Sequence, residues 1–141
     1  MHILVVCPDS YDRWAFGRVE GHCFHFVDAG VSHWEASPDF DPMAYLGRCR
    51  AVLKSHHVDA VVSTHDLGDL IAAVLADEAG LNGPSPEAVF LCLHKLYGRR
   101  AEVDPIRCQA LLLDAPLPTL TYPAYLKAPW LKLGLLGFKV A

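Results

Sequence analysis

The sequence predicts an α/β protein with a mostly parallel sheet and flanking helices. Short apolar runs rich in β-branched residues alternate along the chain with segments whose apolar residues recur every three or four positions. The first pattern is typical of buried parallel strands and the second of amphipathic helices. In addition, 52% of the 141 residues are hydrophobic and 20% are charged. A chain of this size and composition can bury a substantial core in one compact domain.

Three strands are expected in the first half of the chain. The run HILVV at 2–6 is apolar and β-branched, and it predicts a buried strand. A loop without clear periodicity is expected over 8–21, then a strand over 23–27 and irregular chain over 31–41. The run VDAVVS at 58–63 predicts the third strand.

Two helices are expected on either side of that third strand. Asp41 and Pro42 form a helix-start signal, and the helix should run to about residue 56 or 57. The second helix should follow the tripeptide at 64–66 and stop at Gly80, which can adopt the left-handed conformation. Its expected buried stripe consists of large aliphatic side chains: Leu67, Leu70, Ile71, Val74 and Leu75.

A third helix should begin with Ser85 as its cap and Pro86 as its first residue. It carries Lys95 and Arg99, which lie four residues apart and therefore share a face. Together with Arg100 they form a basic cluster, for which a solvated helix face is the simplest interpretation.

The last part of the chain changes character because several prolines interrupt it. A strand is expected over 122–128, a glycine turn over 134–137 and another extended run from residue 138. Lys127 lies in the strand-like run, followed within ten residues by the glycine turn. Turn amides and an ammonium group both favour anions, so phosphate binding is one interpretation of this lysine.

Charge and hydrophobicity exclude several classes of protein. The net charge of −4 and the pI of about 6.0 argue against a nucleic-acid partner. No apolar run approaches the roughly 18 residues that a membrane span needs. The N-terminal sequence lacks the features of a signal peptide, so a cytoplasmic protein is expected. The five cysteines are widely spaced without a CxxC pair, which indicates small buried residues rather than disulfides or a zinc knuckle.

Two familiar kinds of site find little support in the residues. A nicotinamide cofactor site needs a glycine-rich loop after the first strand, and that loop reads CPDSYDRWAFGR, so Asp28 is interpreted as an ordinary turn residue. The sequence HCFH at 22–25 invites a metal, but alternation along a strand places only Cys23 and His25 on a common face. No metal is therefore expected there, and the histidines at 56 and 57 are assigned to the favourable C-terminal end of a helix.

The loop at 63–66 has two open interpretations. It should follow the carboxyl end of a central strand, where ligands bind in open α/β sheets, so it could face a ligand or a second subunit. Its small polar residues are equally those of a simple helix cap.

Two segments together resemble the beginning of an ATP-grasp ligase. The stretch VVSTHDLGDLIAAVLADEAGLNGPSPEAVFLCLHKLYGRR at 61–100 is similar to the family's strand, Thr-His-acid, helix, Gly-Pro-Ser-Pro-Glu-Ala and lysine-bearing helix. The stretch YPAYLKAPWLKLGLLGFKV at 122–140 resembles the Tyr-Pro-x-x-x-Lys-Pro strand and the loop that covers ATP phosphates. The resemblance implies a Rossmann-like pre-ATP-grasp domain over 1–104, and a linker with the first strands or hairpin of a truncated ATP-grasp lobe over 105–141.

The resemblance also implies roles for individual residues. Lys95 and Lys127 would contact ATP, and the loop that contains Gly134 and Gly137 would lie over its phosphates. Such enzymes activate a carboxylate as an acylphosphate that an amine then attacks. Lys95 follows His94, where the family often has aspartate. The family's Mg²⁺-binding carboxylates and catalytic arginine lie downstream of this sequence, so we expect the 141 residues alone to be inactive and to bind Mg²⁺ only with the missing part.

Two other functions fit parts of the sequence. The chain could be a non-catalytic Rossmann-like binding module that pairs as a homodimer or with a partner chain. This alternative uses the apolar residues of the last segment as an association patch: Trp130, Leu131, Leu133, Leu135 and Leu136. A small flavodoxin-like nucleotide-binding protein is the other alternative, although its first loop lacks a phosphate cradle.

Overall fold

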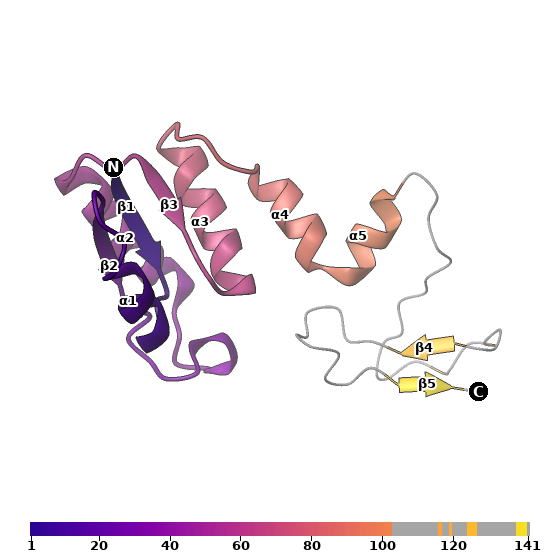
Figure 1. Ribbon diagram of the computed structural model, residues 1–141. Coiled ribbons are helices and arrows are strands. Elements are labelled where there is room, and N and C mark those ends of the chain that lie inside the picture. Colours follow the sequence, from indigo (N-terminus) through magenta and orange to yellow (C-terminus); the bar gives the residue numbers. More distant parts are fainter. Residues whose placement is uncertain (103–115, 117–118, 120–123, 127–137, 141) are drawn as a thin grey trace. The chain divides into compact units, whose positions relative to one another are not determined.

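The computed structural model describes residues 1–102, 116, 119, 124–126 and 138–140 (Figure 1). The chain divides into two compact units, Met1–Val89 and Phe90–Ala141. As predicted, it is an α/β protein with a parallel sheet and flanking helices. Among the described residues, no helix has both the length and the apolarity to cross a bilayer.

The first unit is built on an open parallel sheet in the order β2-β1-β3. Its strands are β1 (His2–Val6), β2 (Cys23–Val27) and β3 (Ala60–Val62), which confirms the three predicted strands. The central strand is the most buried, since the side chains of its last three residues are fully enclosed. In the described sheet β3 is an edge strand, so the expectation that the loop at 63–66 follows a central strand is wrong.

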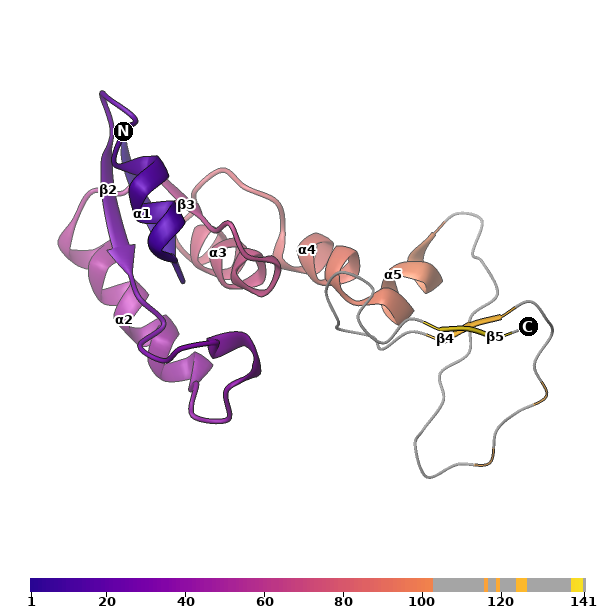
Figure 2. The ribbon, with the colours of Figure 1, turned by 60° about the horizontal axis from the view of Figure 1, so that its bottom comes forward.

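Two helices cover one face of this sheet. Helix α2 (Pro42–Ser55) begins as predicted, because the Asp41 carboxylate accepts hydrogen bonds from the first free amides, 2.9 and 3.0 Å away. Helix α3 (Asp66–Glu78) packs on β3, and the two helices also contact each other. Both helices lie against the sheet (Figure 2). The core between them and the sheet includes Leu4, Tyr45 and Leu75.

The segment expected as a loop over 8–21 contains a helix, α1 (Ser10–Phe16). Asp9 and Asp12 cap it reciprocally: each carboxylate accepts a hydrogen bond from the other's backbone amide, at 2.8 and 2.9 Å. This capping box satisfies two amides that would otherwise have no partner. The ring of Phe16 packs on two phenylalanines of β2. Side chains alternate along a strand, so Phe24 and Phe26 face away from Val27, which packs in the core beneath α2 and α3. Helix α1 therefore covers the face of the sheet opposite to α2 and α3. A short 3₁₀ helix, η1 (Trp34–Ala36), lies in the segment expected to be irregular.

The buried face of α3 differs from the predicted aliphatic stripe. Fully buried positions are mostly small residues, whereas four of the five predicted side chains are half-buried. At Gly68 the reason is close packing, because a Cβ atom there would collide with the side chain of Ser63. The helix stops as expected, with Gly80 in the left-handed conformation (φ 66°).

The predicted third helix is interrupted at His94 and forms α4 (Pro86–Leu93) and α5 (Lys95–Ala101). Its start is confirmed, since the Ser85 hydroxyl accepts a hydrogen bond from the amide of Ala88 at 3.2 Å. The break arises because His94 adopts an extended backbone and caps α5, its Nδ1 accepting a hydrogen bond from the Tyr97 amide at 3.3 Å.

The described residues of the second unit form two strands, β4 (Ala124–Leu126) and β5 (Phe138–Val140), within the segments predicted to be extended. They pair antiparallel, with Tyr125 opposite Lys139. Lys127, Gly134, Gly137 and the apolar residues over 130–136 lie outside the described residues.

Candidate functional site

A cavity of about 590 Å³ opens at the carboxyl edge of the parallel sheet. Three loops line it: Cys7, Pro8 and Asp9 after β1, the segment 28–35 after β2, and His65 after β3. The sheet order explains its position. From β1 the chain passes to a neighbour on one side, β2, and then crosses to the neighbour on the other side, β3. Loops diverge at such a switch point, which is where open α/β sheets bind ligands.

The first strand ends at the cavity in a constrained conformation. Cys7 is not a glycine but has a φ of 50°, in the left-handed region. Its amide donates hydrogen bonds to the Tyr45 hydroxyl at 2.6 Å and to the carbonyl of Val27 at 3.2 Å. The same hydroxyl donates to the Val27 carbonyl at 2.6 Å. A single buried tyrosine therefore ties together the ends of β1 and β2.

Burial of Cys7 raises the pKa of its thiol from 9.0 to about 11. The hydrogen bond with Tyr45 acts in the opposite direction but is the smaller effect. Because a thiolate is the reactive form of cysteine, this protonated thiol is not an activated nucleophile at neutral pH.

Carboxylates surround His65 at the cavity. Its Nε2 atom lies 3.7 Å from Asp12 and 3.9 Å from Asp9, and its Nδ1 atom lies 3.8 Å from Glu35. Asp12 is itself nearly buried and accepts a hydrogen bond from the Thr64 hydroxyl at 2.8 Å. The Nε2 atom of His65 is buried without a hydrogen-bond partner among the described residues. The imidazole therefore lies among these carboxylates at the edge of the cavity.

The lining of the cavity is acidic. It contains the carboxylates of Asp9, Asp28 and Glu35, and no lysine or arginine is among the described residues that line it. Arg13 neutralises only Asp28, with a guanidinium nitrogen 2.6 Å from each carboxylate oxygen. An acidic cavity favours a cationic or hydrogen-bond-donating ligand and disfavours a phosphate.

The loop at 63–66 combines local hydrogen bonds with one residue that lines the cavity. Ser63 and Thr64 make structural hydrogen bonds, the Ser63 hydroxyl accepting from the His65 amide at 3.2 Å. His65 precedes α3 without capping it through its side chain, and it lines the cavity instead. The helix-cap interpretation is wrong in that His65, the N-cap of α3, makes no side-chain capping bond, and the ligand-facing interpretation stays a prediction.

The sequence missed Asp9, Asp12 and Glu35 as residues of a site. A signal for the first two was present, since both come soon after the end of a predicted strand. The structure places Lys95 at the start of α5, where Arg99 pairs with Glu102 at 2.6 Å.

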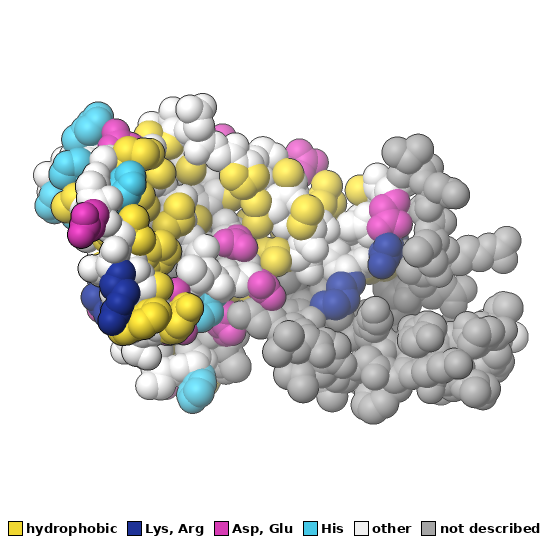
Figure 3. Space-filling view, in the orientation of Figure 1, with side chains coloured by type: hydrophobic (Ala, Val, Ile, Leu, Met, Phe, Trp, Pro, Cys, Tyr) yellow, Lys and Arg dark blue, Asp and Glu magenta, His cyan; other side chains and the backbone are white. Residues whose placement is uncertain are grey.

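Histidines gather at the opposite, amino edge of the sheet (Figure 3). Cys23 and His25 share a face as predicted, with Sγ 3.8 Å from Nε2. His2, which the sequence did not connect with them, lies beside His25. His56 follows the C-terminal end of α2, and its Nδ1 atom lies 3.3 Å from a carbonyl of the last turn.

Comparisons with known proteins identify no relative of this chain. No protein-family model, no curated protein and no solved structure matches the chain. The site is therefore interpreted from its own residues.

Proposed function

We propose that this chain is the N-terminal portion of an ATP-dependent carboxylate–amine ligase of the ATP-grasp type, and that its carboxyl-edge cavity holds a substrate. The observation that carries the proposal is the acidic cavity at the switch point of a parallel sheet. The resemblance of 61–100 and 122–140 to the family supports it, as does the antiparallel pairing of β4 with β5.

Charge selects the part of the substrate that this cavity would hold. Two carboxylates, Asp9 and Glu35, face His65 from different loops. They would attract the ammonium or amine group of the nucleophile and repel the carboxylate that becomes activated. The cavity is accordingly assigned to the amine substrate.

ATP is assigned to residues outside this cavity. In the proposal Lys95 and Lys127 contact the nucleotide, and the loop with Gly134 and Gly137 covers its phosphates. Lysine charges would stabilise the charge that develops during phosphoryl transfer, and a closing loop would exclude water. Mg²⁺ would be held by residues downstream of this sequence, and a cytoplasmic location would supply the ATP.

Photo-crosslinking of azido-ATP to the native protein that carries this sequence tests the nucleotide part. Labelling should fall about tenfold or more in Lys127→Ala, because one phosphate-binding charge is removed. It should be unchanged in Lys54→Ala, an exposed lysine of α2. Equal labelling of both variants would contradict the role of Lys127. The intact mass of the native protein should also exceed 15.5 kDa.

A matched pair of small probes tests the cavity. An amino-acid amide, which is cationic, should shift the backbone NMR signals of Cys7 and His65, whereas its N-acetylated, neutral counterpart should not. Glu35→Gln should weaken the binding of the cationic probe. Identical shifts with both probes would refute the charge argument.

A non-catalytic binding module is the second candidate function. The observation in its favour is the acidic lining of the cavity, which has no lysine or arginine among the described residues and so suits the binding of a cation rather than of ATP. Binding of the cationic probe by a native protein that neither binds nor hydrolyses ATP would favour this candidate over the ligase.

A further inference from the structure

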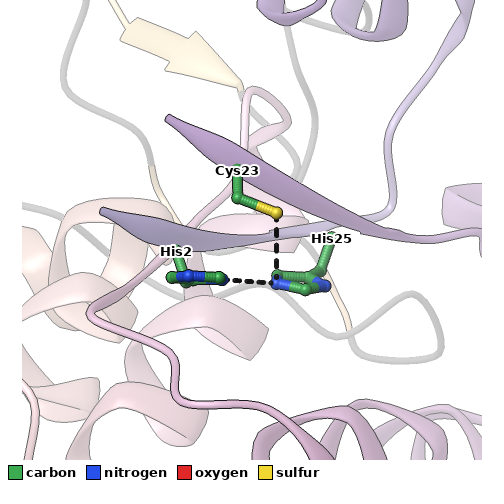
Figure 4. Close-up of side chains that lie close together, drawn as sticks. All are labelled: His2, Cys23 and His25. Atoms are coloured by element: carbon green, nitrogen blue, oxygen red, sulfur yellow. Dashed lines mark hydrogen bonds between the residues drawn. The ribbon is translucent and has the colours of Figure 1, made fainter. Parts of the chain in front are cut away.

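Three side chains with metal-binding atoms meet at the amino edge of the sheet (Figure 4). The parallel register places His2 directly beside Cys23. His25 follows Cys23 by two residues and so projects from the same face of β2. The Nδ1 atom of His2 lies 3.2 Å from the Nε2 atom of His25, and the Sγ atom of Cys23 lies 3.8 Å from the same nitrogen.

These separations match the edges of a tetrahedral zinc site. With Zn–N of about 2.05 Å and Zn–S of about 2.3 Å, tetrahedral angles give about 3.3 Å between two nitrogens and about 3.6 Å between nitrogen and sulfur. The two observed distances differ from these values by about 0.2 Å or less. The third edge is no longer than 4.8 Å. It can close by side-chain rotation, because His2 and Cys23 are exposed.

A fourth imidazole lies beside the three side chains. The centroid of the His56 ring is 4.4 Å from that of His25. The Nδ1 atom of His56 contacts the Ser55 hydroxyl at 2.9 Å, so the Nε2 atom of His56 is the nitrogen that can bind a metal.

The backbone of His2 is fixed by a neighbouring carboxylate. Asp59 accepts a hydrogen bond from the His2 amide at 2.7 Å, just before β3 begins. This bond holds the start of β1 against the sheet and limits the positions open to the His2 ring.

We propose that His2, Cys23 and His25 bind one Zn²⁺ ion, with water or His56 in the fourth position. Two imidazoles and a thiolate form a borderline-soft ligand set, which prefers zinc to Mg²⁺ or Ca²⁺. Binding releases the thiol proton of Cys23 to solvent and involves no redox step. The site lies at the opposite edge of the sheet from the cavity and does not depend on the ligase proposal.

Zinc titration of the full 141-residue chain, prepared without a histidine tag and kept reduced with a phosphine, tests the site. Competition with a chromophoric chelator should give one Zn²⁺ per chain, and affinity should fall about tenfold or more in His25→Gln and Cys23→Ser. Co²⁺ serves as a spectroscopic probe, because a thiolate ligand adds a charge-transfer band. That band should be present in the wild type and absent from Cys23→Ser.

Two controls use the same chemistry at neighbouring positions. His22→Gln changes a histidine whose ring packs towards Phe24, on the other face of β2. Cys92→Ser changes an exposed thiol of α4. Both should bind Zn²⁺ like the wild type.

Equal zinc affinity in the wild type and in the ligand variants would overturn the proposal, as would Co²⁺ binding without a thiolate band. The remaining explanation would then be hydrogen bonding between neutral side chains. Far-UV circular dichroism checks the fold of each variant. Should His25→Gln unfold, Cys23→Ser decides the question by itself, because its side chain is exposed.

Discussion

Replacing Tyr45 with phenylalanine removes one oxygen atom from the centre of the first unit. The side chain is fully buried, and its hydroxyl is the bridge between the Cys7 amide and the Val27 carbonyl. The phenyl ring retains the shape of the tyrosine, so packing is preserved. Tyr45→Phe therefore isolates the contribution of two hydrogen bonds at the carboxyl ends of β1 and β2.

The expected loss follows from what remains at those two backbone groups. Each buried hydrogen bond contributes about 1 kcal/mol net, and a group left without any partner costs about 1–3 kcal/mol. Here neither group is left alone, because the Cys7 amide still donates to the Val27 carbonyl at 3.2 Å. We therefore expect Tyr45→Phe to lower the free energy of unfolding by about 1–2 kcal/mol. For a unit of this size, that corresponds to a decrease in Tm of roughly 4–16 °C.

Urea denaturation followed by circular dichroism measures this loss. The midpoint should move to lower urea while the slope stays constant, because the surface exposed on unfolding is unchanged. Tyr11→Phe is the matched control, because it removes the same hydroxyl from a side chain that is 67% exposed. This substitution should change the free energy of unfolding by less than about 0.5 kcal/mol. If the two variants have equal stability, the hydroxyl of Tyr45 does not hold the strand ends together.

Two further predictions concern the same unit. Gly68→Ala should lower the free energy of unfolding by about 1–2 kcal/mol although alanine favours helices, because the new Cβ collides with the Ser63 side chain. In thermal unfolding, the additional substitution Ser63→Gly should restore most of this loss. A Gly68→Ala protein that is more stable than the wild type would refute this packing. The pKa of the Cys7 thiol rises on folding from 9.0 to about 11. The contribution of this thiol to the free energy of unfolding is therefore complete below pH 9 and is lost as the pH rises through 11. The free energy of unfolding should therefore fall by about 2–3 kcal/mol over that interval. In urea denaturation at several pH values the fall should be smaller for Cys7→Ala, and an unchanged fall would show that other groups cause it.

The elements that the sequence predicted are those whose signals are local. A run such as HILVV or an Asp-Pro pair predicts a strand or a helix start from a few adjacent residues. The predictions of β1 and of the start of α2 are therefore confirmed. Helix α1 was missed because seven residues are too few to reveal a helical period. Its capping box, Asp9 with Asp12, was nevertheless visible in the sequence.

The errors in the later helices have a tertiary or conformational origin. Hydrophobicity predicts an aliphatic stripe for α3, whereas its buried face consists mostly of small residues, and at Gly68 the close approach of Ser63 leaves no room for a side chain. The sequence pattern predicts one continuous third helix, because it does not reveal that the His94 ring caps a new helix. Hydrophobic periodicity continues through such a break and does not reveal it.

Both sites depend on pairings between strands that are distant in sequence. Cys23 and His25 could be placed on a common face by alternation alone, but His2 joins them only through the parallel register of β1 and β2. In the same way, His65 meets Asp9 and Asp12 because β3 lies beside β1. A sequence specifies such neighbours only once the order of the strands is known.

The sheet separates the chemistry of its two edges. Three carboxylates line the cavity where the strands end, and His2 and His25 lie beside Cys23 where the strands begin. Strands of five residues hold the two groups roughly 15 Å apart, which exceeds the Debye length of about 8 Å at physiological ionic strength. A zinc ion at the amino edge would therefore change the potential in the cavity little, because exposed charges at that distance are largely screened. The zinc site and the amine-binding cavity are for this reason independent proposals, and the failure of one would leave the evidence for the other intact.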